Sequence, residues 1–231
     1  MKTILVSGAN RGIGFEFSKQ YAQSGHQVLA CCREPEKARA LAEIAQQYPH
    51  VKLLTLDISD GDSIHNLATE LTGVAIDVLI NNAAVYGDDH SKGFGQLNYH
   101  YWLDVLAVNM LAPVRVTETL LPNLLAGDSK LVVAITSKMG SIADNSSGGS
   151  LLYRSSKAGL NAAMKSLSVD LAEHGAGVLI LHPGWVQTDM GGSQALITAE
   201  QSVSGMCKLI NGFSMADSGQ FMDYSGKQVP W

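Results

Sequence analysis

The feature that most constrains this chain is a glycine-rich turn near its N-terminus. An apolar run at residues 4–6 leads into Ser7-Gly8-Ala9-Asn10-Arg11-Gly12-Ile13-Gly14, and a helical pattern begins at Ile13. Glycine suits such a turn because it accepts positive φ angles and lets the backbone approach a ligand closely. The helix start then offers free N–H groups and a positive dipole end to an anion. This context favours a site for the pyrophosphate of a dinucleotide, with a ligand-free strand-to-helix turn as the alternative.

The remaining segments alternate between short apolar runs and stretches with helical spacing. The runs predict strands over residues 4–7, 27–32, 51–56, 77–80, 130–136, 178–181 and 220–222. Helices are predicted between them, among them one over 99–125 kinked at Pro113 and one over 151–174, whereas 86–96 and 138–150 have loop composition. Regular alternation predicts an α/β fold: a doubly wound parallel sheet, or Rossmann fold, with helices on both faces. We expect one domain over residues 1–231.

Composition excludes several classes of protein. A length of 231 residues with 46% hydrophobic residues fits one globular domain with a substantial core. A net charge of -5 without a basic run argues against nucleic acid as a partner. No apolar stretch approaches the ~20 residues that span a bilayer, and the N-terminus lacks a signal-peptide pattern. We therefore expect a soluble, cytoplasmic protein that binds no membrane.

The cysteines fit the same compartment. Cys31, Cys32 and Cys207 form no Cys-x-x-Cys pair, and an odd number suits a reducing environment better than a disulfide framework. None has histidine partners at metal-ligand spacing, so we expect no metal.

A second candidate motif is the pair Tyr153 and Lys157. Residues four apart share a helix face, so the two side chains project together. A tyrosine with a pKa of about 10 donates a proton poorly at neutral pH, and a nearby ammonium lowers that pKa. The pair is therefore a plausible general acid/base, although tyrosine and lysine at this spacing also occur on solvated helix faces.

The two motifs together make the chain resemble the short-chain dehydrogenase/reductase family. The resemblance covers the whole length, because six features follow the family's order and spacing: Gly8-x-x-x-Gly12-x-Gly14, Asn81-Asn82-Ala83, Asn109, Ser137, Tyr153-x-x-x-Lys157 and Pro183-Gly184. The loop from Lys138 into Tyr153-Arg154 and the C-terminal Pro230-Trp231 are similar to small carbonyl-reductase-like members, the C-factor and sniffer proteins.

The resemblance implies catalytic roles for four residues. Tyr153 would be the general acid of carbonyl reduction, and Lys157 would hold the nicotinamide ribose and depress the pKa of Tyr153. Ser137 would bind the substrate oxygen, and the backbone carbonyl of Asn109 would hold a water of the proton relay. The residues by themselves also allow a strand-end cap for Ser137 and a helix-bend residue for Asn109.

Cofactor contacts follow from the same resemblance. In the phosphate turn they are Gly8, Asn10, Arg11, Gly12 and Ile13. Asp57 and Ile58 would flank the adenine, and Asn82 and Ala83 would lie beside its ribose. Val186 and Thr188 follow the sixth strand, and the catalytic residues Tyr153 and Lys157 complete the set. Asp57 has an alternative reading as the N-cap of the next helix. Ala84 stands where the family has glycine, and its methyl would crowd the cofactor without abolishing binding.

Arg33 directs the choice of dinucleotide toward NADP(H). An acid near the end of the second strand would accept hydrogen bonds from the ribose of NAD(H) and repel a 2′-phosphate. Here the strand ends in Cys31-Cys32-Arg33, and Arg11 stands in the turn, so both guanidinium groups are expected to converge on the phosphate. The alternatives are a solvated Arg33 and a Glu34 that holds the ribose of NAD(H).

The resemblance implies an oxidoreductase that acts on a small-molecule carbonyl or alcohol. The segment near 189–212 is short, which predicts a small substrate lid. A dinucleotide-binding signalling or regulatory protein with incidental redox activity is the main alternative, and an epimerase or dehydratase is less compatible with so short a C-terminal part.

In this family, long helices such as 99–125 and 151–174 pair across a two-fold axis, so we expect a homodimer, with a tetramer as the alternative.

Overall fold

Seven parallel strands form one sheet at the centre of the molecule. A computed structural model describes residues 1–89 and 93–231, so residues 90–92 of the predicted loop 86–96 lie outside the described residues. The strands are β1 (Thr3–Ser7), β2 (Gln27–Cys32), β3 (Val51–Thr55), β4 (Val78–Asn81), β5 (Leu131–Ile135), β6 (Gly177–His182) and β7 (Phe221–Asp223). Their order is β3-β2-β1-β4-β5-β6-β7, and every neighbouring pair is parallel. The predicted α/β fold is confirmed.

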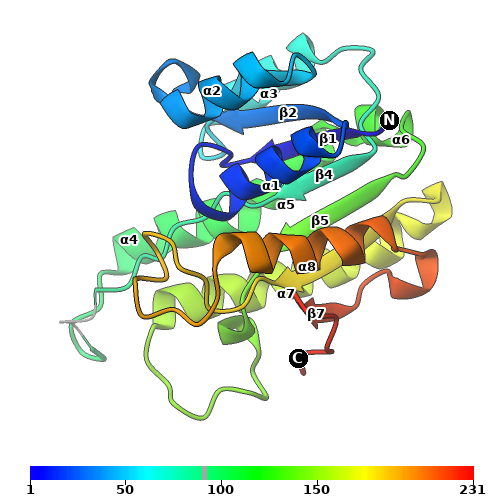
Figure 1. Ribbon diagram of the computed structural model, residues 1–231. Coiled ribbons are helices and arrows are strands. Elements are labelled where there is room, and N and C mark those ends of the chain that lie inside the picture. Colours follow the sequence, from blue (N-terminus) through cyan, green and yellow to red (C-terminus); the bar gives the residue numbers. More distant parts are fainter. Residues whose placement is uncertain (90–92) are drawn as a thin grey trace.

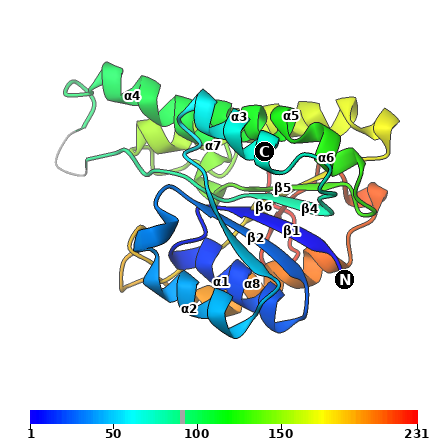
Figure 2. The same ribbon diagram turned by 90° about the horizontal axis from the view of Figure 1, so that it is seen from above.

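Helices cover both faces of this sheet (Figures 1 and 2). One face carries α1 (Gly12–Gln23), α2 (Arg39–Gln47) and α8 (Ala199–Asn211). The other carries α3 (Gly61–Glu70), α5 (Ala112–Thr119), α6 (Leu121–Leu125) and α7 (Leu151–Asp170), with α4 (Tyr99–Leu106) extending beyond the sheet.

The alternation of side chains along β1 explains why this strand lies at the centre. Ile4, Leu5 and Val6 are all fully buried. Because successive side chains point to opposite faces, Leu5 joins the core under α3 and α7, whereas Ile4 and Val6 join the core under α1 and α8. A run that is apolar at every position therefore matches a strand covered on both sides.

The long helix predicted over 99–125 is interrupted in two places, so the prediction of one kinked helix is wrong in detail. A π-helical turn over Ala107–Leu111 separates α4 from α5, and a second break at Leu120 precedes α6. Pro113 and Pro122 each lie in the first turn of the helix that follows a break. Proline interrupts a helix because it lacks the N–H that would bond the preceding turn, so both breaks lie directly before a proline-containing turn.

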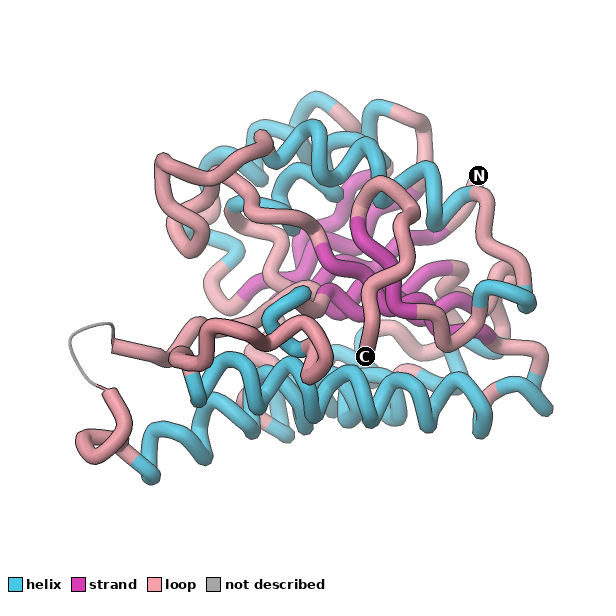
Figure 3. The backbone as a smooth tube through the Cα atoms, turned by 90° about the horizontal axis from the view of Figure 1, so that it is seen from below, coloured by secondary structure: helices cyan, strands magenta, loops and turns pink. Residues whose placement is uncertain are grey.

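The sheet topology determines where a ligand can bind. The chain leaves β1 toward β2 on one side, whereas β4 lies on the other side of β1, and this reversal opens a crevice at the carboxyl ends of the two strands. The segments that follow β1, β4, β5 and β6 all begin at this edge, because the strands are parallel. Figure 3 shows the strands enclosed between helices, with long loops at one end of the sheet.

Candidate active site

The glycine turn between β1 and α1 is packed against the end of β4. A Cβ atom on Gly14 would lie 2.2 Å from the carbonyl oxygen of Gly8, and one on Gly8 would lie 3.0 Å from Ala83. Gly8 also has a φ of +67°, which favours glycine. The amide of Asn82 donates hydrogen bonds to the carbonyls of Ser7 (2.9 Å) and Gly8 (3.3 Å). Asn82 and Ala83 therefore fix the turn itself.

The first turn of α1 is available to an anion. Arg11 precedes this helix in an extended conformation, and its side chain makes no capping hydrogen bond to the helix. Gly12 has a φ of +56°, and a Cβ there would come within 3.3 Å of the Thr188 methyl group. Thr188 thus closes over the turn from the segment after β6, and Ile13 is the second residue of α1. Backbone N–H groups at such a helix start bind phosphate well.

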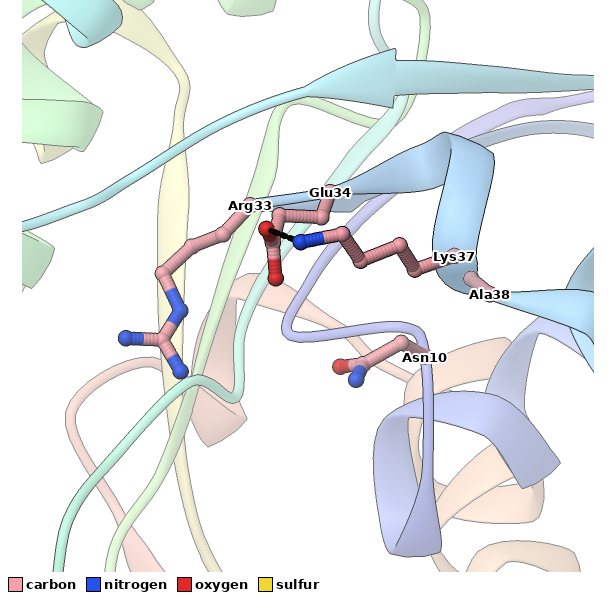
Figure 4. A pocket seen from close by; sticks show the side chains of 5 residues that line it. All are labelled: Asn10, Arg33, Glu34, Lys37 and Ala38. Atoms are coloured by element: carbon pink, nitrogen blue, oxygen red, sulfur yellow. Dashed lines mark hydrogen bonds and ion pairs between the residues drawn. The ribbon is translucent and has the colours of Figure 1, made fainter.

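A small polar pocket lies at the carboxyl end of β2. Asn10, Arg33, Glu34, Lys37 and Ala38 line it. Figure 4 shows the Glu34 carboxylate bonded to the Lys37 ammonium, with the Arg33 guanidinium extending away from this pair. Among the described lining residues, the pocket therefore offers an arginine whose neighbouring acid, Glu34, is paired with Lys37.

The Arg11 side chain pairs with an acid of the segment after β6. Its guanidinium bonds the Asp189 carboxylate at 2.5 Å, and Arg11 is not among the residues that line the pocket containing Arg33. Arg11 thus connects the glycine turn to the segment after β6. Convergence of the two arginines on a phosphate stays a prediction.

Ser137, Tyr153 and Lys157 come together at the carboxyl end of β5. The hydroxyls of Ser137 and Tyr153 share a hydrogen bond, and the Lys157 ammonium lies 5.8 Å from the centre of the Tyr153 ring. Lys157 is 2% exposed and donates to the carbonyl of Ile135 at 3.0 Å. Ser137 also accepts a hydrogen bond from the N–H of Met139, so it is a strand-end cap as well as a partner of the tyrosine.

Burial dominates the protonation of this cluster. It raises the pKa of Tyr153 to about 12, although the hydrogen bond from Ser137 opposes that shift. Burial also lowers the pKa of Lys157 to about 8. The expectation that the ammonium depresses the pKa of Tyr153 is therefore not met in this arrangement. Tyr153 stays protonated at neutral pH, as a proton donor must.

Asn109 lies in the π-helical turn between α4 and α5 and is fully buried. Its side-chain oxygen accepts from the N–H of Val85 (2.9 Å), and its amide donates to the carbonyl of Val85 (2.7 Å) and to Ser156 (3.0 Å). The helix-bend interpretation is thus correct for the side chain. A water held by the backbone carbonyl stays a prediction.

The remaining predicted cofactor residues occupy the same edge. Asp57 and Ile58 follow β3, but the N-cap of α3 is Asp60, whose carboxylate accepts from the N–H of Asp62 at 2.9 Å. The Asp57 carboxylate instead accepts from the N–H and hydroxyl of Ser59. Val186 is buried and pairs with Ile197 in an isolated bridge after β6.

Two residues near Tyr153 were not found by sequence reasoning. The ring of Tyr86 lies 5.0 Å from that of Tyr153, and Asp88 accepts hydrogen bonds from the N–H groups of Leu152 and Tyr153. Both belong to a segment that the sequence marks only as a loop. Their distance from Tyr153 along the chain explains why no local pattern indicates them.

Two features are absent from the described residues, 1–89 and 93–231. No group of three or more His, Cys, Asp or Glu side chains there could share a metal ion. Within the same residues, no helix has both the length and the apolar character that crossing a membrane requires.

Comparisons with known proteins agree with this geometry. Residues 2–196 match the family model for short chain dehydrogenase. The chain is 46% identical to the C-signal of Myxococcus xanthus over 164 residues, which cover 71% of this chain and 98% of that protein. Among solved structures, carbonyl reductase Sniffer of D. melanogaster has a TM-score of 0.92 at 31% identity and 100% coverage of both chains. NADPH-bound carbonyl reductase from chicken fatty liver has a TM-score of 0.93 at 33% identity and covers 100% of this chain and 99% of that one.

Proposed function

Because the chain belongs to the short-chain dehydrogenase/reductase family, we propose that it is an NADP(H)-dependent oxidoreductase that reduces a carbonyl compound to an alcohol. The observation that carries the proposal is the cluster of Ser137, Tyr153 and Lys157, at the same edge of the sheet as the glycine turn. The names of two similar structures, both carbonyl reductases and one of them NADPH-bound, support the same reaction.

The residues of the cluster divide the work of proton transfer. The Tyr153 hydroxyl donates a proton to the carbonyl oxygen, and the Ser137 hydroxyl holds that oxygen by a hydrogen bond. The Lys157 ammonium stabilises the phenolate that forms, because opposite charges attract strongly where water is excluded. A bound nicotinamide dinucleotide supplies the hydride.

The chain's own residues fit such a dinucleotide. The absence of side chains at Gly8 and Gly14 and the uncapped start of α1 suit a pyrophosphate. The pocket around Arg33 suits a 2′-phosphate, since a guanidinium gives paired, charge-assisted hydrogen bonds to phosphate. Glu34 is the acid that could have held the ribose of NAD(H), but its carboxylate forms an ion pair with Lys37. We therefore place NADP(H) ahead of NAD(H).

The alternative, a dinucleotide-binding signalling or regulatory protein with incidental redox activity, gains no support from this arrangement. Such a protein would have no need of a tyrosine hydroxyl placed beside Ser137 and Lys157. The segment near 189–212, which includes α8, stays our proposal for a short substrate lid, since Thr188 and Asp189 bring its start onto the glycine turn.

The experiment that tests the function follows NADPH absorbance with a panel of aldehydes, ketones and quinones. At least one compound should be reduced by the wild-type protein, with the alcohol or quinol identified as the product. NADPH that binds but is consumed with none of the panel would contradict the proposal.

We also propose a homodimer. Tyr99, Leu103 and Leu111, on α4 and the π-helical turn, are between 57% and 68% exposed, and Val169 of α7 is 67% exposed. These side chains would lose contact with water where two copies pair along the helices, and burying apolar area is favourable. Light scattering at micromolar concentration should report twice the mass of 24.6 kDa. A monomer under those conditions would rule the pairing out.

A further inference from the structure

The start of α7, which carries Tyr153, has no cap of its own. Gly148, Gly149 and Ser150 all have left-handed backbone conformations and turn the chain sharply into this helix. An N-cap residue normally has an extended backbone that directs its side chain to the N–H groups of the second and third helical residues. Ser150 has a φ of 45° and makes no such bond, so its own side chain leaves those two donors unsatisfied.

Asp88 satisfies both donors from a different part of the chain. One carboxylate oxygen accepts from the N–H of Leu152 at 3.2 Å, and the other accepts from the N–H of Tyr153 at 2.8 Å. These are the second and third residues of α7, which an N-cap side chain would serve. The negative charge also lies at the positive end of the helix dipole, where it is stabilising.

The segment that carries Asp88 is itself fixed at three other points. Asn109 holds the N–H and the carbonyl of Val85, and the Tyr86 hydroxyl bonds the Ser150 hydroxyl at 2.8 Å. Gly87 has a φ of +81°, and a Cβ there would lie 2.3 Å from the Val105 side chain. Residues 85–88 therefore run from the π-helical turn to the start of α7 and place the Tyr86 ring against that of Tyr153.

We propose that Asp88 is a positioning residue for Tyr153: it caps α7 from residues 85–88 and so fixes the tyrosine hydroxyl relative to the substrate carbonyl. The inference rests on the proposed function, in which Tyr153 is the proton donor. Asp88 acts through the backbone of the first turn and touches no reacting atom. Its effect should be large, because a displacement of about 1 Å at a reacting group can cost about 100-fold in rate.

The test compares Asp88→Ala with Asp60→Ala. Asp60 caps α3 with one hydrogen bond, so its loss removes a cap far from Tyr153 along the chain. For Asp88→Ala we expect kcat to fall at least about tenfold while the Kd for NADPH changes less than about twofold. Amide hydrogen exchange at Leu152 and Tyr153 should accelerate in this variant alone. Asp60→Ala should lose thermal stability and keep kcat within about twofold of wild type.

A second variant keeps the test decisive if Asp88→Ala does not fold. Asp88→Asn retains one carbonyl oxygen and one of the two hydrogen bonds, so kcat and exchange should lie between those of wild type and the alanine variant. A wild-type kcat in every folded Asp88 variant, or unchanged exchange at Leu152 and Tyr153, would overturn the proposal.

Failure of the proposed function gives a different result. In that case the wild-type protein would reduce no carbonyl compound, yet exchange at Leu152 and Tyr153 would still report whether Asp88 caps α7. Faster exchange together with an unchanged kcat would remove the positioning role and leave the oxidoreductase intact.

Discussion

The glycine turn and the surroundings of Tyr153 are built in different ways. The turn is mostly local: Gly8, Gly12 and Gly14 lie within seven consecutive residues, and short contacts from Asn82, Ala83 and Thr188 hold it in place. The position of Tyr153 depends on the segments that follow β4 and β5, on Asn109 of the π-helical turn and on the first turn of α7. The difference shows that the proposed dinucleotide site rests largely on one short motif, whereas the proposed proton donor is placed by tertiary contacts.

The largest effect should come from the tyrosine. Tyr153→Phe retains the ring and its contact with Tyr86 but removes the hydroxyl that donates the proton. We expect kcat/KM for a carbonyl to fall about 1,000-fold while the Kd for NADPH stays within about threefold, because general acid catalysis contributes about 10²–10⁴. Steady-state kinetics and a fluorescence titration check both values. If Tyr153→Phe keeps nearly full turnover, Tyr153 is not the proton donor, and the proposed separation of NADPH binding from proton donation is wrong.

The turn can be broken without touching the tyrosine. Gly14→Ala adds a methyl group 2.2 Å from the Gly8 carbonyl, so the unfolding free energy should fall by about 3 kcal/mol and NADPH binding should weaken.

Gly25→Ala is the matched control, because its φ is +75° and no atom lies within 4 Å of the added methyl group. It should cost only about 1 kcal/mol, the strain of a left-handed alanine. Urea unfolding of both variants, followed by NADPH titration, separates the two effects. Equal losses of stability would contradict the close packing at Gly14.

A smaller effect is expected from the pocket that contains Arg33. Arg33→Ala should weaken NADPH about tenfold and leave NADH nearly unchanged, a difference of ~1.4 kcal/mol. Lys37→Met should weaken NADPH by less, about threefold, because it releases Glu34 without removing the guanidinium. Calorimetric titration of both dinucleotides checks the ratio. A selectivity ratio that neither substitution changes would contradict the role of this pocket.

The contrast between the local glycine turn and the tertiary surroundings of Tyr153 also explains which features the sequence could predict. The strands, the order of the elements and the turn follow from local signals, since Ile4 to Val6 are apolar at every position and glycine is required beside Asn82. Ser137, Tyr153 and Lys157 were found because their motif is recognisable, and the fold brings them together as expected.

Other features depended on partners that are distant in the chain. Arg11 pairs with Asp189, which lies 178 residues away, and Asp88 caps a helix that begins more than 60 residues later. The π-helical turn at Asn109 forms where its side chain holds Val85, and nothing in the local helical spacing indicates it. Burial raises the pKa of Tyr153. The spacing of Tyr153 and Lys157 in the sequence does not show how deeply the tyrosine is buried.

The most direct test of the account uses NADPH carrying two deuterium atoms at C4 of the nicotinamide and a carbonyl compound that the wild-type protein reduces. Mass spectrometry of the product should find one deuterium on the carbon of the new alcohol, and Tyr153→Phe should form that product about 1,000-fold more slowly. An alcohol without deuterium, or one formed equally fast by the variant, would contradict hydride transfer with Tyr153 as the proton donor.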